Sequence, residues 1–170
     1  HYFNEQSLYE SGAIESVLDM LNDKNLIYKK EGATWFKATS SGRPQDRVII
    51  KSTGEPTYRL PDMAYHLNKF ERKYDFMVDV LGADHMDAYP DVLAGIEQLG
   101  CSVDKVTVLI HQFVTLTKNG EPVKMSTRKA QFVTLDELID EVGEDVVRYF
   151  FLMRGMNTHL NFDLDLAKEE

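Results

Sequence analysis

Apolar residues recur every three or four positions in several stretches of the chain, which is the spacing of helices with one buried face. This spacing predicts helices over residues 11–24, over residues 62–72 and between Gly82 and Gly100. Ser11 stands where its side-chain oxygen can cap the first of these helices. The first two thirds of the chain are therefore expected to contain several amphipathic helices.

A capping box predicts where a further helix begins. Thr134 is followed three residues later by Glu137, so each side chain can accept a hydrogen bond from the backbone of the other. This helix is expected to stop at Gly143, and residues 144–153 are expected to form another helix directly after it. The pattern of residues 162–166 fits either a strand or a helix.

Three runs rich in β-branched and apolar residues predict strands over residues 47–51, 76–81 and 106–112. The second run is almost continuously apolar, which predicts a strand that is buried on both faces. Two shorter runs on either side of Gly32 are typical of a hairpin, and Asn119-Gly120 predicts a second hairpin turn.

Strands and helices alternate along residues 47–112. This order predicts a parallel sheet and places the chain in the α/β class. Right-handed crossovers bring the loops that follow the strands to one edge of such a sheet, where ligands bind. That edge is expected to carry residues 82–86 and the neighbourhood of Gln112.

Composition indicates a globular chain. Apolar residues make up 43% and charged residues 28% of the 170 positions, and no apolar run approaches the roughly 20 residues of a membrane-spanning helix. Cys101 is the only cysteine, which excludes an internal disulfide and a cysteine-based metal site, and the histidines show no metal-binding spacing. We expect a soluble, cytoplasmic protein with no metal of its own. Because the chain starts with His1, we also expect it to be processed or truncated.

The charge of the chain is uneven. Its net charge of −9 argues against a surface that binds nucleic acid everywhere. Between residues 114 and 133, however, four basic residues stand against one acidic residue, which gives +3. Lys124, Arg128 and Lys129 of this segment are candidates to stabilise a leaving pyrophosphate, and the alternative is a basic loop that is merely solvated.

Two further places could contact a ligand. Asp84 follows Gly82 at a predicted junction of strand and helix, where a carboxylate can bind ribose hydroxyls or simply cap the helix. Tyr58 and Asp62 lie four residues apart at the start of a helix, where Asp62 is again a possible cap. An acid beside a phenol suits a guanidinium group, which favours planar contacts with carboxylates and with aromatic faces.

These residues, in this order and spacing, resemble the arginyl-tRNA synthetases. Residues 51–58 (KSTGEPTY) and 62–66 (DMAYH) resemble one sequence block of that family, and residues 80–85 (VLGADH) resemble another. Residues 124–126 (KMS) are similar to the KMSKS signature of class I synthetases. The resemblance continues through residues 132–138, 148–154 and 162–166, so it covers nearly the whole chain.

The resemblance implies the second half of a Rossmann-type, parallel-sheet catalytic domain, followed by helices after the KMSKS-like loop. It divides the chain into a small helix-plus-hairpin region at residues 1–46, a Rossmann half with the ligand-binding edge at 47–125, and the loop with its helices at 126–170. The implied activity joins L-arginine to tRNA(Arg), with ATP as a substrate that is accompanied by Mg²⁺.

The resemblance also implies roles for single residues. Arginine is expected to contact Tyr58, Asp62 and His85. ATP is expected to contact Gly82, Asp84, His85, Phe113, Lys124 and Met125. Catalysis, through stabilisation of pyrophosphate, is expected from Lys124, Ser126, Arg128 and Lys129.

Some positions depart from the family's pattern. Met86 and Asp87 stand where a second histidine and a glycine are usual, and Thr127 replaces the second lysine of the signature. Ala130-Gln131 replaces a usual Gly-Asn pair. The His-x-Gly-His motif that grips ATP phosphates in class I enzymes is absent from the sequence. We therefore expect a fragment that lacks the N-terminal catalytic half and the anticodon-binding domain and that has no activity alone.

Two alternatives stay open. One is a free-standing nucleotide- or tRNA-binding half-domain without catalysis, and the other is a class I enzyme for a different amino acid, against which Asp62 weighs. A severed Rossmann half should expose apolar residues where its other half packs, and the expected members are Val48, Ile49, Ile50 and Val78. We expect residues 124–131 to be mobile without a ligand, because few of their side chains are apolar.

Overall fold

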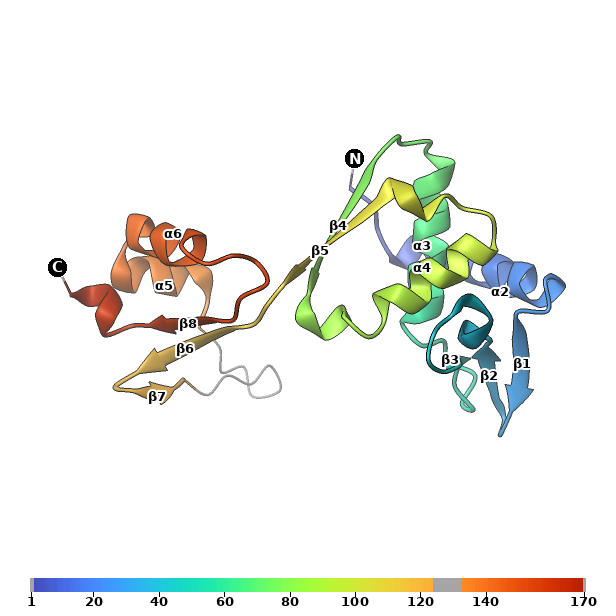
Figure 1. The fold of residues 1–170 in the computed structure, drawn as a ribbon, viewed down its shortest axis with the longest axis horizontal. Helices are drawn as coiled ribbons and strands as arrows, with labels where there is room; N and C mark the ends of the chain where they lie inside the picture. The colour runs from blue at the N-terminus through green and yellow to red at the C-terminus, as the bar shows by residue number, and fades with distance from the viewer. Residues whose placement is uncertain (1, 124–132, 170) are drawn as a thin grey trace. The chain divides into compact units, whose positions relative to one another are not determined.

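The structure is a computed structural model that describes residues 2–123 and 133–169 (Figure 1). The chain divides into two compact units. Unit 1 comprises His1–Asp79 and Asp84–Val108, and unit 2 comprises Val80–Ala83 and Leu109–Glu170. Each unit has its own apolar core.

Unit 1 contains an antiparallel sheet of three strands in the order β1 (Ile27–Lys30), β2 (Ala33–Phe36) and β3 (Arg47–Ile50). The turn between the first two strands has positive φ angles at Glu31 (54°) and Gly32 (76°), as a tight hairpin turn requires, so the predicted hairpin is confirmed.

The strand at residues 47–51 was expected in one parallel sheet with the next two strands, and this expectation is wrong. Among the described residues, β3 pairs with β2, and β4 (Met77–Gly82) pairs with β5 (Val106–His111) in a separate two-stranded sheet. The strands β2 and β3 follow one another along the chain, and consecutive strands commonly pair with each other.

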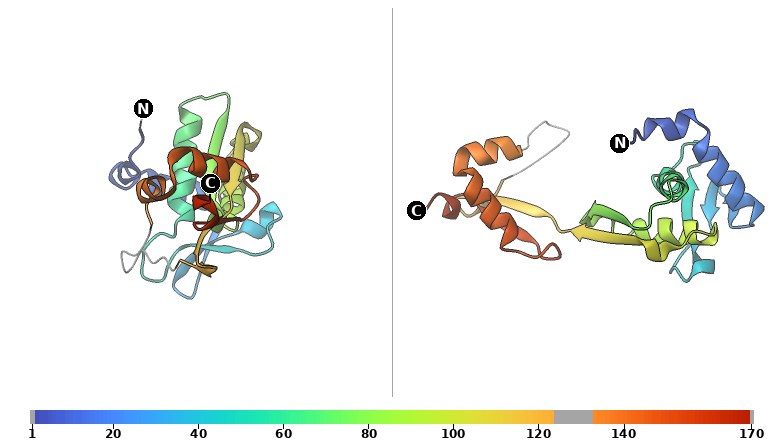
Figure 2. Two further views of the ribbon diagram at one scale, coloured as in Figure 1. Left: turned by 90° about the vertical axis from the view of Figure 1, so that its left-hand side faces the viewer. Right: turned by 90° about the horizontal axis from the view of Figure 1, so that it is seen from above.

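Four helices belong to unit 1: α1 (Gln6–Glu10), α2 (Ala13–Asp23), α3 (Arg59–Glu71) and α4 (Tyr89–Gln98). In the views of Figure 1 and Figure 2, α3 lies beside both α2 and α4. Their fully buried side chains, with those of the sheet, form one core: Val17, Leu21, Phe36, Ile49, Leu60, Met63, Val92 and Ile96.

Ser11 does not cap α2, contrary to the prediction. It ends α1 with helical backbone angles (φ −87°, ψ −8°), and the residue that precedes α2 is Gly12 in a left-handed conformation (φ 75°). The chain reverses at that glycine, so the hydroxyl of Ser11 is not placed over the first turn of α2.

The prediction that β4 is buried on both faces is also wrong. Met77 is 5% exposed, whereas Val78 and Val80 of the same strand are 47% and 62% exposed, and Phe76 directly before the strand is 62% exposed. The exposed Val78 agrees with the prediction of an apolar patch. Ile49, predicted for the same patch, is instead fully buried because it faces the core of unit 1.

Unit 2 is built on three strands in the order β7 (Glu121–Pro122), β6 (Val114–Lys118) and β8 (Leu160–Asp163). β6 pairs antiparallel with β7 and parallel with β8. The predicted turn between β6 and β7 is confirmed, with positive φ angles at Asn119 (53°) and Gly120 (74°). Residues 162–166, whose pattern fitted either a strand or a helix, begin within strand β8, which is followed by a 3₁₀ turn at Leu166–Lys168.

Two helices, α5 (Leu135–Val142) and α6 (Glu144–Leu152), cover this sheet around the fully buried Phe162. The predicted capping box is confirmed: the Glu137 N–H donates to Thr134 Oγ1 at 3.1 Å, and the Thr134 N–H donates to the Glu137 carboxylate at 2.8 Å. The α/β class is confirmed as well. No helix within the described residues is long and apolar enough to cross a membrane.

Candidate functional site

The first turn of α3 presents Tyr58 and Asp62, as the sequence predicted. Tyr58 is the N-cap residue and is 86% exposed. Asp62 does not cap the helix, because it lies inside the first turn and its N–H donates to the Tyr58 carbonyl at 3.1 Å. The carboxylate of Asp62 is therefore free of the helix-capping role that was its simplest explanation.

The carboxylate of Asp62 borders a cavity of about 180 Å³ that is lined by Phe3, Glu5, Leu8, Pro61, Asp62 and Tyr65. No described residue forms an ion pair or a hydrogen bond with this carboxylate. Burial raises its pKa, against the charges of His66 and His85, and the charges of Glu5 and Asp79 add to the rise. A cation bound in this cavity would offset the cost of burying the charged carboxylate and the repulsion from Glu5 and Asp79.

Tyr58 lines a different cavity of about 450 Å³, together with Tyr9, Lys51, Glu55, Pro56 and Thr57. The structure thus brings Tyr58 and Asp62 to the same end of α3 but not into one cavity. Lys51, the cationic residue that lines the cavity of Tyr58, forms an exposed ion pair with Glu55 at 3.1 Å.

His66 joins α3 to the start of β4. Its Nε2 lies 2.7 Å from Asp79 Oδ2, and its Nδ1 lies 2.7 Å from the carbonyl oxygen of Asp62. Both ring nitrogens of His66 therefore lie within hydrogen-bonding distance of an oxygen atom. Lys69 forms a further ion pair with Asp79. Burial alone would raise the pKa of Asp79, but hydrogen bonds from His66 and Lys69 lower it to about 2.

The segment after β4 carries the residues expected to contact ATP. Gly82 ends β4, and Ala83–His85 form a 3₁₀ turn in which the side chains of Asp84 and His85 are 67% and 45% exposed. The alternative that Asp84 caps the next helix is wrong, because α4 starts after Ala88. Phe113, between β5 and β6 in unit 2, is 58% exposed.

The residues expected to stabilise pyrophosphate lie outside the described residues. They are Lys124, Ser126, Arg128 and Lys129, and the same holds for Met125, for the departures at Thr127 and Ala130-Gln131, and for the predicted mobility of that segment. Their roles stay predictions.

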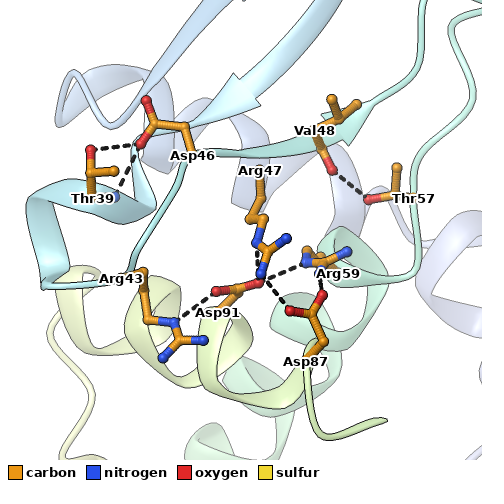
Figure 3. A network of polar contacts seen from close by, with 9 residues as sticks. All are labelled: Thr39, Arg43, Asp46, Arg47, Val48, Thr57, Arg59, Asp87 and Asp91. Carbon is orange, nitrogen blue, oxygen red and sulfur yellow. Dashed lines mark hydrogen bonds and ion pairs between the residues drawn. The ribbon is translucent and has the colours of Figure 1, made fainter. Parts of the chain in front are cut away.

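Sequence reasoning missed an ionic cluster around Asp91, which is shown in Figure 3. Asp91 lies on α4 and is fully buried. Arg43 Nε lies 2.8 Å from Oδ1, while Arg47 Nε and Arg59 Nε lie 2.8 Å and 3.0 Å from Oδ2. Three arginines from separate segments thus compensate one buried carboxylate, which fastens α4 to β3 and α3.

Asp87 extends this cluster towards the Ala83–His85 turn. Its carboxylate accepts from Arg47 Nη2 at 2.6 Å and from Arg59 Nη2 at 2.9 Å. Partial desolvation raises the pKa of Asp87, but the two arginines outweigh it and lower the pKa overall. Asp87, noted in the sequence as a departure from the family's pattern, therefore ties the segment after His85 to β3 and α3.

Residues 4–153 match the family described as tRNA synthetases class I (R), catalytic domain, and the chain belongs to this family. The chain is 60% identical over 170 residues to the arginine–tRNA ligase of Desulfotalea psychrophila and 59% identical over 169 residues to that of Salinibacter ruber. The alignments take in 100% and 99% of this chain but 31% and 30% of the relatives, so the chain spans about a third of their length.

Solved structures agree on the fold. A structure described as a putative arginyl-tRNA synthetase from Campylobacter jejuni matches 99% of this chain and 36% of its own, with a TM-score of 0.80 and 36% identity. The arginyl-tRNA synthetase from Plasmodium falciparum has the same fold at 19% identity, with a TM-score of 0.68 over 99% of this chain and 32% of its own. The predicted class I catalytic-domain fold is confirmed.

Proposed function

We propose that this chain is part of an arginine–tRNA ligase, which activates arginine with ATP to arginyl-adenylate and pyrophosphate and then transfers arginine to tRNA(Arg). The observation that carries the proposal is the carboxylate of Asp62, which lies partly buried beside a cavity without an ionic partner among the described residues. Membership of the synthetase family and 60% identity to an arginine–tRNA ligase support it.

Arginine is proposed to bind at the start of α3. Asp62 can accept two parallel hydrogen bonds from a guanidinium group, and such planar contacts favour arginine over lysine. Tyr58, exposed one turn earlier, offers an aromatic face and a hydroxyl. His85 is close enough for its charge to act on Asp62, so it is proposed as the third contact of the amino acid.

ATP is proposed to bind along the segment after β4 and at the signature loop, with Gly82, Asp84, His85, Phe113, Lys124 and Met125 as its contacts. Lys124, Ser126, Arg128 and Lys129 are proposed to stabilise the pyrophosphate as it leaves. Mg²⁺ is proposed to arrive on the ATP phosphates, as it does in many nucleotide enzymes. The described residues contain no group of three or more side chains that could hold a metal by themselves.

The activity is proposed to require more than these 170 residues, since they cover 31% of the length of the Desulfotalea psychrophila relative. The proposed further parts are a first catalytic half and an anticodon-binding domain. The compartment implied by ATP and tRNA as substrates is the cytoplasm. A free-standing binding half-domain is not favoured, because the relatives that contain this segment are ligases and because β4 exposes Val78 and Val80.

The test is a calorimetric titration of the full-length natural protein with arginine and with lysine, before and after Asp62→Asn. Arginine is expected to bind at least about tenfold more tightly than lysine, and the substitution is expected to remove that preference. Asp75→Asn is the matched control, because Asp75 is an exposed acid that lines none of the cavities described here. Equal binding of the two amino acids by the unchanged protein would contradict the proposed function.

A further inference from the structure

Asp87 lies in a short segment of unit 1, residues 84–88, that leads into α4. The segment carries Asp84 and His85, two of the proposed substrate contacts, whose side chains are 67% and 45% exposed. Because these side chains are exposed, their position depends mainly on the backbone of the segment, in which the Ala88 N–H donates to the His85 carbonyl at 2.9 Å. An interaction that holds this backbone therefore also holds the proposed contacts.

Two arginines hold the carboxylate of Asp87 (Figure 3). Arg47 Nη2 donates to its Oδ1 at 2.6 Å, and Arg59 Nη2 donates to its Oδ2 at 2.9 Å. The Nε atoms of the same arginines lie 2.8 Å and 3.0 Å from Asp91, which is fully buried. Each guanidinium thus spans two carboxylates. Because Asp91 already holds both arginines, their contacts with Asp87 cost little additional side-chain entropy.

Arg59 connects this segment with the start of α3. It is the first residue of α3, directly after Tyr58, and Asp62 follows it within the first turn. Burial raises the pKa of Asp62 and the charge of His85 opposes that rise, so residues 84–88 lie near this end of the helix. The regions proposed to bind arginine and ATP therefore share one ionic connection.

We propose that Asp87 is a positioning residue for the reaction between arginine and ATP. It touches neither substrate, and it fixes residues 84–88 relative to the start of α3 so that the bound substrates meet in the orientation that the reaction needs. This inference rests on the proposed function, because it takes arginine and ATP as the substrates. A glycine at this position has no side chain to accept from Arg47 and Arg59, so the role belongs to a chain that carries an acid here.

The competing explanation is that Asp87 only adds a small amount of stability. It predicts a small loss of unfolding free energy and an unchanged reaction rate in the folded variant. A positioning role predicts instead that both substrates still bind, whereas the bound complex reacts more slowly. The two explanations therefore differ in how a substitution divides its effect between substrate binding and the rate of the bound complex.

The experiment measures single-turnover aminoacylation of tRNA(Arg) by the full-length natural protein at varied concentrations of arginine and ATP, so that product release does not enter the rate. Asp87→Asn keeps the size of the side chain and removes its charge. It is expected to lower the maximal rate constant about tenfold and to change either half-saturating concentration by less than about twofold. Asp87→Glu keeps the carboxylate and is expected to recover the rate to within about threefold of the unchanged protein.

Hydrogen exchange adds a measurement that does not depend on catalysis. The Ala88 N–H, which donates to the His85 carbonyl, reports whether residues 84–88 are held in place. Its exchange is expected to be about tenfold faster in Asp87→Asn than in the unchanged protein, and within about threefold of the unchanged protein in Asp87→Glu.

The matched control is Glu97→Gln, which removes the charge of an exposed acid on α4 and is expected to leave the rate within about twofold. If urea unfolding showed that Asp87→Asn had lost its fold, Asp87→Glu and Asp87→Gln, which have side chains of equal length, would decide. An unchanged maximal rate constant in the folded uncharged variant, with arginine still bound more tightly than lysine, would overturn this inference and leave the proposed function intact. Equal affinity of the unchanged protein for arginine and lysine would overturn both.

Discussion

Two carboxylates of unit 1, those of Asp91 and Asp62, differ in whether the protein provides ion-pair partners for them. Asp91 on α4 is fully buried and lies within 3.0 Å of nitrogen atoms from Arg43, Arg47 and Arg59. Asp62 on α3 is partly buried and has no cationic partner of that kind among the described residues, although its pKa is raised by burial. The carboxylate of Asp91 forms ion pairs within the protein, whereas the carboxylate of Asp62 forms none with the described residues.

The difference separates an acid that is paired within the protein from an acid that we propose binds a ligand. A carboxylate removed from water needs hydrogen bonds and opposite charge, or it becomes protonated. Asp91 obtains both from the protein. Asp62 accepts no hydrogen bond from a described residue at its carboxylate, and the charges of His66 and His85 do not offset the cost of its burial, so its pKa is raised beside a cavity. Asp79, paired with His66 and Lys69, belongs with Asp91 on the structural side.

The largest expected effect follows from removing Asp91. Asp91→Ala leaves three arginines without their shared carboxylate and is expected to lower the free energy of unfolding by about 3–5 kcal/mol, as measured by urea denaturation. Asp19→Ala, which removes an exposed acid of α2, is the control and is expected to change it by less than about 0.5 kcal/mol. A similar small loss in both variants would show that the cluster does not fasten α4.

The next effect concerns Asp79 and depends on pH. Its pKa is about 2 in the folded protein against an ordinary value of 3.8, so the folded state favours the ionised form. This contributes about 2 kcal/mol above pH 4, which is lost as the pH falls from 4 towards 2. Asp79→Asn is expected to be less stable than the unchanged protein at pH 7. The difference between the two urea midpoints should shrink steadily across that acidic range, and a constant difference would contradict the pairing.

A smaller effect is expected at Asp87, which shares two arginines with Asp91 but has a side chain that is 67% exposed. Solvent screens such a pair, so Asp87→Asn is expected to lower the free energy of unfolding by at most about 1 kcal/mol. Repeating the urea titration in 1 M NaCl should reduce the loss, because salt weakens exposed ion pairs. The loss of unfolding free energy in Asp91→Ala should persist in the same salt. If salt reduced the loss equally in both variants, the expected difference between a buried and an exposed ion pair would be wrong.

The smallest effect on stability is expected at Asp62. Its raised pKa means that the fold disfavours the ionised carboxylate, so this group lowers stability as the pH rises through its ordinary value and up to the folded one. Asp62→Asn is therefore expected to leave stability at pH 7 unchanged or slightly higher. Urea titrations at pH 4 and pH 7 measure this. A marked loss of unfolding free energy at pH 7 would show that Asp62, like Asp91, stabilises the fold.

Several features that depend on neighbours in sequence were predicted from the sequence, although the predicted Ser11 cap was wrong. The capping box at Thr134 and Glu137 and the turns at Glu31-Gly32 and Asn119-Gly120 need only a few adjacent residues, and each was found where it was expected. The positions of Tyr58 and Asp62 at the start of α3 followed from the same local signals and from the family resemblance.

Features that depend on distant residues were not predicted. Asp91 meets Arg43 and Arg59 across 48 and 32 residues of sequence, and each of these residues alone has the character of a surface charge. The residue pattern of a single strand also does not indicate which strand it pairs with, so the pairing of β3 with β2 rather than β4 was not predicted. Arg43, Arg47 and Arg59 stand close together in the sequence before α4, which was an available signal for the cluster.

The contacts of Arg72 affect the choice of denaturant for the unfolding measurements. Its guanidinium lies 5.8, 5.7 and 5.4 Å from the rings of Phe3, Tyr65 and Tyr74, which fixes the segment in front of α1. Guanidinium chloride, used as a denaturant, supplies the same chemical group at molar concentration. It would compete with Arg72 for those rings and imitate the proposed ligand at Asp62. Urea carries no charge, so it is the denaturant with which ligand binding and unfolding stay separate.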